Sequence, residues 1–120
     1  MNGPLAHANP ADALWHDVCA LADIVPGTGV AARINGRQLA LFNTPEGVFA
    51  LGNLDPFSGA NVMARGIIGD LEGKLVVASP VYKQHFCLRT GICLEDMSVM
   101  LPVWLVSVRA GRVWVASSGC

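Results

Sequence analysis

The chain contains 120 residues with a formal net charge of −1 at pH 7, and 52% of its residues are hydrophobic while 14% are charged. This length predicts one domain with its own hydrophobic core, and the near-neutral charge argues against nucleic acid or an anionic membrane as a partner. No run approaches the ~20 consecutive apolar residues of a membrane-spanning helix, and residues 1–10 lack the features of a secretory signal. We therefore expect a cytoplasmic protein.

Short strands separated by tight turns are predicted along most of the chain. Residues 1–13 are expected to form a flexible tail, residues 14–117 the domain, and residues 118–120 a second short tail. Apolar alternation and turn residues predict strands at residues 14–21, 30–34, 38–42, 48–51, 67–70, 74–78, 103–109 and 112–116. With the small hairpin expected after residue 86, this pattern indicates an all-β fold. We predict an antiparallel β-sandwich or small barrel of about eight to ten short strands.

Two loops in the second half of the chain combine residues in an unusual way. One reads Asp-Pro-Phe-Ser-Gly-Ala from Asp55, and the other reads Ser-Pro-Val-Tyr-Lys-Gln-His-Phe from Ser79. This framework is that of a Rieske iron–sulfur site, in which Cys-x-His and Cys-x-x-His supply two thiolates to one iron and two imidazoles to the other. Asp55, Phe57, Ser79 and Tyr82 stand at the four ligand positions. Phenyl cannot bind iron, and lone oxygen ligands suit a sulfide cluster poorly, so we predict a degenerate site without a cluster.

The order of the motifs resembles the small subunit of assimilatory NAD(P)H-dependent nitrite reductase. The matching segments are Gly-x-x-Asp-Pro-Phe-Ser-Gly-Ala-Asn, Arg-Gly-Ile-Ile-Gly-Asp, Ser-Pro-x-Tyr-Lys-Gln-His-Phe and Leu-Arg-Thr-Gly. The resemblance extends over residues 14–115 and implies a Rieske-like domain that lacks the 2Fe-2S ligands. It implies no catalytic residue, cofactor or metal on this chain. It further implies a large partner subunit that carries FAD, an iron–sulfur cluster and sirohaem and reduces nitrite to ammonia in nitrate assimilation.

The residues of the two loops are candidates for structural roles and for contacts with that partner. Asp55, Ser79 and Tyr82 could hydrogen-bond across the vacated site and link the loops, or Asp55 could simply begin a turn before Pro56. Phe57 and Tyr82 could be aromatic anchors for a partner, or they could fold inward and fill the volume left by the cluster. The predicted partner interface consists of Phe57, Tyr82, Lys83, Gln84 and His85.

Two cysteines support a competing hypothesis. If Arg89-Thr90-Gly91 forms a three-residue turn, Cys87 faces Cys93 across a hairpin and could form a disulfide or, with His85, a metal site. Free thiols are the expected state in a reducing compartment. The same two cysteines would supply the only plausible thiolates of a redox protein with unconventional cluster ligands. A further alternative is a cluster-free Rieske-fold interaction module of another oxidoreductase or oxygenase system.

Overall fold

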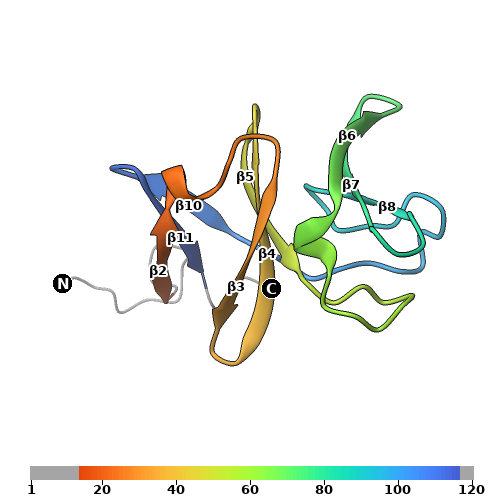
Figure 1. Ribbon diagram of the computed structural model, residues 1–120, viewed down its shortest axis with the longest axis horizontal. Coiled ribbons are helices and arrows are strands. Elements are labelled where there is room, and N and C mark those ends of the chain that lie inside the picture. The colour runs from red at the N-terminus through yellow and green to blue at the C-terminus, as the bar shows by residue number, and fades with distance from the viewer. Residues whose placement is uncertain (1–13, 117–120) are drawn as a thin grey trace.

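The computed structural model describes residues 14–116, which form three antiparallel sheets (Figure 1). The first sheet has the order β10 (Val106–Arg109), β11 (Arg112–Ala116) and β2 (Trp15–Ala20). The second has the order β3 (Gly29–Ile34), β4 (Arg37–Thr44), β5 (Gly47–Gly52) and β9 (Val103–Trp104). The third has the order β6 (Ile67–Leu71), β7 (Lys74–Ala78) and β8 (His85–Cys87). The predicted all-β class with about eight to ten short strands is confirmed.

The four-stranded sheet lies between the other two sheets, and both of its faces are buried (Figure 1). Successive side chains of a strand point to opposite faces, yet four consecutive residues of β4 are buried. Leu39 and Leu41 pack in a cluster with Val113 of the first sheet. Ala40 and Phe42 belong to a second cluster on the other face, toward the third sheet. The apolar run in β4 is therefore explained by burial on two sides.

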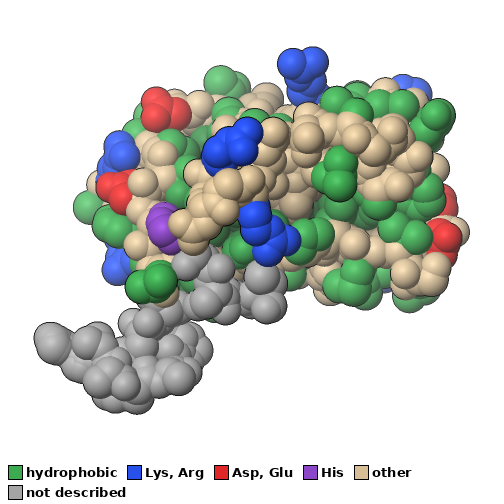
Figure 2. All heavy atoms as spheres, turned by 90° about the horizontal axis from the view of Figure 1, so that it is seen from below, with side chains coloured by type: hydrophobic (Ala, Val, Ile, Leu, Met, Phe, Trp, Pro, Cys, Tyr) green, Lys and Arg blue, Asp and Glu red, His purple; other side chains and the backbone are tan. Residues whose placement is uncertain are grey.

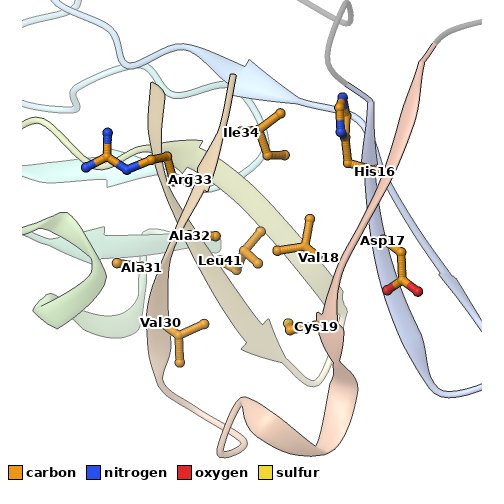
Figure 3. Close-up of a pocket in the computed structure, with 10 residues that line it drawn as sticks. All are labelled: His16, Asp17, Val18, Cys19, Val30, Ala31, Ala32, Arg33, Ile34 and Leu41. Carbon is orange, nitrogen blue, oxygen red and sulfur yellow. The ribbon is translucent and has the colours of Figure 1, made fainter. Parts of the chain in front are cut away.

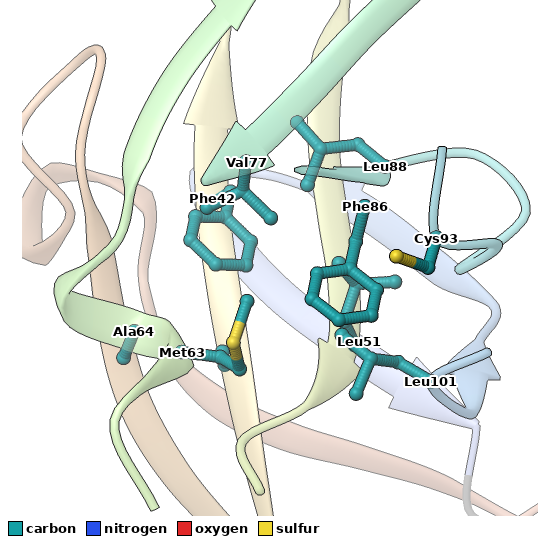
Figure 4. Close-up of a cluster of buried hydrophobic side chains, with 10 residues drawn as sticks. Phe42, Leu51, Met63, Ala64, Val77, Phe86, Leu88, Cys93 and Leu101 are labelled. Atoms are coloured by element: carbon teal, nitrogen blue, oxygen red, sulfur yellow. The ribbon is translucent and has the colours of Figure 1, made fainter. Parts of the chain in front are cut away.

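The third sheet and the loops around it, residues 53–102, are called the loop subdomain below. Its core is built from side chains of several loops and strands that converge on the face of the four-stranded sheet (Figure 4). Phe86 of β8 lies in this core with Met63, Leu101 and Cys93, and none of the four side chains is more than 2% exposed. Since so many loop residues contribute to it, this core fixes the loops as well as the sheet.

The structure differs from the predicted elements in three places. The strand expected at residues 103–109 is divided at exposed Leu105, because β9 pairs with β5 while β10 pairs with β11 in a different sheet. Two three-residue 3-10 helices, η2 (Leu21–Asp23) and η3 (Met63–Arg65), were not predicted. The predicted tails at residues 1–13 and 118–120 lie outside the described residues. Within the described residues, no helix is long and apolar enough to cross a membrane.

Candidate functional site

The two loops with the Rieske-like framework lie side by side at one end of the loop subdomain. Loop 1, residues 53–62, leaves β5 and is closed by hydrogen bonds from Asp55 N–H to the Ala60 carbonyl (2.8 Å) and from Gly59 N–H to the Asp55 carbonyl (2.8 Å). Loop 2, residues 79–84, connects β7 to β8 and is closed by a hydrogen bond from Ser79 N–H to the Gln84 carbonyl (2.9 Å). Both loops are therefore tight turns held by their own backbones.

A buried carboxylate joins the two loops. The Ser79 hydroxyl donates to Asp55 Oδ2 at 2.5 Å, and the Phe57 N–H donates to Asp55 Oδ1 at 2.9 Å. Asp55 and Ser79 are 0% and 1% exposed. Burial raises the pKa of Asp55, but hydrogen bonds from Ser79, Phe57 and Ser58 outweigh it and hold the pKa below its ordinary value of 3.8. The two roles considered for Asp55 are thus combined, since one oxygen links the loops and the other begins a turn.

The two aromatic residues of the loops take opposite positions. The Phe57 ring is half-buried and packs against Phe86, with ring centroids 6.2 Å apart. Of the two positions considered for Phe57, the ring therefore takes the inward one and fills space beside the core. The Tyr82 side chain is 62% exposed and no hydrogen bond connects it to Asp55 or Ser79 in the described part of the chain, so its predicted part in the link across the site is wrong.

The remaining residues of the predicted interface follow Tyr82 along the chain. Lys83 is exposed and has a φ of 66°, which places it at the outer bend of loop 2. Gln84 is half-buried, and its Oε1 atom has no hydrogen-bond partner within the described residues. His85 donates its backbone N–H to Glu95 Oε1 at 2.8 Å, and its Nδ1 lies 2.6 Å from Glu95 Oε2. Tyr82, Lys83 and Gln84 thus lie in loop 2, and His85, the first residue of β8, ties the end of that loop to Glu95.

Two residues that position the loops were not found by sequence reasoning. Asn53 is 2% exposed and binds three segments through its side chain: its Nδ2 donates to Gln38 Oε1 and to the Asn61 carbonyl, and its Oδ1 accepts from Ala64 N–H at 2.8 Å. Glu95, described above, braces the end of loop 2. Neither belongs to a motif, and their partners are 8 to 15 residues away, so no local pattern marks them.

The three-residue turn that would place Cys87 opposite Cys93 does not form. The hairpin after β8 has Cys93 opposite Phe86, and Cys87 N–H donates to the Ile92 carbonyl. The loop therefore has four residues, because Leu88 is buried in the core and Gly91, with a φ of 78°, lies against the Leu101 carbonyl. Cys87 and Cys93 consequently occupy opposite faces, and both are free thiols. In the described residues, no three His, Cys, Asp or Glu side chains gather where they could hold a metal ion.

A groove of about 300 Å³ lies between β2 and β3, away from the loop subdomain (Figure 3). Apolar side chains such as Val18, Leu41 and Ile34 line it. Two charged side chains at its border, Asp17 and Arg33, point away from it in Figure 3. Asp17 forms an ion pair with Arg112 at 3.0 Å on the outer side of the sheet. These two charged groups are therefore turned away from the groove, which His16 and Cys19 also line.

Comparisons with known proteins give consistent results. The model of the Rieske-like [2Fe-2S] domain family matches residues 14–116. The nitrite reductase (NADH) small subunit of Salmonella typhimurium is 43% identical over 101 residues, which cover 82% of this chain and 94% of that protein. The nitrite reductase [NAD(P)H] large subunit of Klebsiella oxytoca is 42% identical over 103 residues, which cover 86% of this chain and 11% of that protein. The solved structure of a putative NADH-dependent nitrite reductase small subunit from Mycobacterium tuberculosis is 45% identical with a TM-score of 0.85, covering 90% of this chain and 98% of that one.

Proposed function

Because the chain belongs to the family of NADH nitrite reductase small subunits, which are Rieske-like domains, we propose that it supports the reduction of nitrite to ammonia without carrying electrons itself. It binds the large subunit, on which FAD, an iron–sulfur cluster and sirohaem reside, through loop 1 and loop 2. The observation that carries this proposal is the hydrogen bond between Ser79 and Asp55, which joins the two loops where a cluster would otherwise join them.

The donor atoms at the four ligand positions do not fit a [2Fe-2S] cluster. The carboxylate of Asp55 is already bound by Ser79 and Phe57 N–H, and Phe57 itself presents a hydrocarbon ring that packs toward Phe86. Tyr82 offers only a phenol oxygen. A cluster of this kind takes two thiolates and two imidazoles, and the two thiols of the loop subdomain, those of Cys87 and Cys93, lie on opposite faces of the hairpin after β8. No step of the proposed function therefore passes through a cluster on this chain.

Exposed apolar side chains at the loops support the docking role. Leu54, Val81 and Tyr82 are 50%, 42% and 62% exposed although they flank the buried Asp55–Ser79 link. Hydrophobic side chains are spread over the surface of this end of the molecule (Figure 2). Exposed aromatic and apolar side chains at loop ends are typical of the residues that interfaces bury. The Klebsiella oxytoca relative supports the choice of partner, because a segment similar to this chain occurs within a large subunit there.

The first prediction concerns iron. The chain purified without oxygen is expected to be folded, colourless and free of stoichiometric iron, because the four ligand positions offer neither thiolate nor imidazole. The measurement is visible absorption together with iron analysis on the same sample, with circular dichroism to establish that the protein is folded. Near-stoichiometric iron with visible absorption would make the chain an electron carrier and would overturn the proposal.

The second prediction concerns the complex. Changing Tyr82→Ala with Lys83→Glu is expected to weaken binding to the large subunit by at least about tenfold, since exposed aromatic anchors dominate many interfaces. The matched control is Val25→Ala with Arg33→Glu, because Val25 is 63% exposed and both residues lie outside the loop subdomain. Titration of the large subunit by isothermal calorimetry measures both variants. Equal binding by both would place the interface elsewhere on the domain.

We also propose that the chain works in the cytoplasm. Cys19, Cys87 and Cys93 are all free thiols in the described residues. Unpaired cysteines in this number suit a reducing compartment, where thiols persist.

A further inference from the structure

A third loop of the loop subdomain exposes methionine side chains that its packing does not require. This loop, residues 94–101, follows the hairpin after β8 and leads into β9. Met97 and Met100 are 76% and 58% exposed, whereas Val99 is half-buried and Leu101 is 2% exposed. The loop thus turns one set of apolar side chains into the core and presents another set to solvent.

Hydrogen bonds hold the third loop in this conformation. Cys93 N–H donates to the Val99 carbonyl at 2.9 Å, and Leu101 N–H donates to the Gly91 carbonyl at 2.8 Å. Within the loop, Ser98 donates its N–H (3.1 Å) and its hydroxyl (2.6 Å) to Asp96 Oδ1. The exposure of Met97 and Met100 is therefore a property of an ordered loop, fixed at both ends.

The third loop is continuous with the proposed docking loops. Glu95 of the third loop binds His85 at the end of loop 2. On the other side, Met100 borders a groove of about 410 Å³ together with Leu54 and Pro56 of loop 1. The exposed side chains of Leu54, Met97 and Met100 are called the methionine band. Leu54 and Met100 border one groove, and Met97 lies three residues before Met100 in the third loop, beside a different groove.

A second groove beside Met97 indicates the chemistry of the surface that would cover it. The groove has a volume of about 450 Å³, and apolar residues including Leu71, Ile92 and Met97 line it. Glu72 and Glu95 stand at its border, with Lys74 as the basic residue there. Methionine adapts well to irregular apolar surfaces. Glu95 is already bound by His85, so the exposed Glu72 is the carboxylate of this groove that favours a basic side chain on the partner.

We propose that the methionine band and the groove beside Met97 are a second part of the docking surface, and that they receive an apolar segment of the large subunit bordered by Lys or Arg. This inference rests on the proposed function, because it assumes that the large subunit binds at loops 1 and 2. It adds that the contact continues onto the third loop.

Methionine oxidation tests the inference directly. Full-length chain, alone and in complex with the large subunit, is treated with dilute peroxide, and mass spectrometry measures sulfoxide at each methionine. Met97 and Met100 are expected to oxidise readily in the free chain and to be protected in the complex to the level of Met63, which is 0% exposed and acts as the internal control. A complex in which both oxidise as in the free chain would overturn this inference and leave the proposed function intact. Failure of the unmodified chains to form a complex would overturn both.

A pair of matched variants gives an independent readout. Met97→Glu with Met100→Glu is expected to weaken binding at least about tenfold, which corresponds to about 1.4 kcal/mol. The control is Val25→Glu with Val108→Glu, two residues that are 63% and 43% exposed outside the loop subdomain. Circular dichroism establishes that all variants fold. Equal binding by the two double variants would count against the methionine band.

Discussion

Replacing Asp55 by alanine is expected to lower the free energy of unfolding by about 3–5 kcal/mol. The substitution removes two hydrogen bonds to a buried charge, each contributing about 1.5–3 kcal/mol, and it leaves the Phe57 N–H and the Ser79 hydroxyl without that acceptor. It also separates loop 1 from loop 2, so binding to the large subunit should weaken in parallel. Urea unfolding at neutral pH measures the first effect, and calorimetric titration of the large subunit measures the second.

Two control variants, and the pH dependence of their stability, distinguish the hydrogen bonds of Asp55 from general packing. Ser79→Ala removes one of the two hydrogen bonds and should cost less than Asp55→Ala, and Asp55→Asn keeps the shape but removes the charge. The pKa of Asp55 in the folded protein is lowered from its ordinary value of 3.8. The charged carboxylate therefore stabilises the fold fully at pH values above that ordinary pKa. The contribution is lost as the pH falls through the folded-state pKa. The stability difference between the native chain and Asp55→Asn should therefore narrow in acid, and a difference that stays constant would contradict this assignment.

Replacing Phe86 by alanine is expected to cost about 3–5 kcal/mol, the usual range for removing a large buried ring. Phe86 is 0% exposed, lies at the centre of the cluster in Figure 4 and supports the Phe57 ring of loop 1. Thermal and urea unfolding measure the loss. Phe57→Ala is the matched control, and it should cost clearly less because Phe57 is only half-buried. Equal losses would mean that the Phe57 ring contributes as much stability as the Phe86 ring, which would contradict this prediction.

The link between the two loops could be predicted from the sequence because the chemistry of its residues limits the contacts that they can make. A buried aspartate requires donors, and Ser79 was the donor that the two-loop framework placed beside it, so the link between the loops could be anticipated. The direction of Phe57 could not, because an aromatic ring suits both a core and an interface. Its position depends on the contact with Phe86, a residue of another strand.

The errors in the prediction have a common physical origin. The hairpin after β8 has four loop residues because Leu88 is buried and Gly91 packs closely against the Leu101 carbonyl. Both constraints come from distant parts of the chain, and a shift of one residue is enough to place Cys87 and Cys93 on opposite faces. Likewise, the division between β9 and β10 reflects a change of sheet that the apolar pattern of residues 103–109 does not reveal.

The apolar composition also has a structural explanation. The middle sheet is covered on both faces, so β4 and β5 require apolar residues at successive positions. Part of the 52% hydrophobic content is thus used in two separate cores rather than on an exposed surface. The apolar residues that remain exposed in the loop subdomain, such as Tyr82 and Met97, are more informative about binding than the overall composition.

The pairing of Trp15 with Ala116 brings the beginning and the end of the described chain together on adjacent strands. These strands, β2 and β11, lie at the opposite end of the molecule from the loop subdomain (Figure 1). A domain whose ends meet at one place can be inserted into a longer polypeptide without being unravelled. The same geometry would leave loops 1 and 2 facing outward whether the domain is a separate chain or part of a larger one. It explains how one fold can be used both as an independent subunit and as a built-in module.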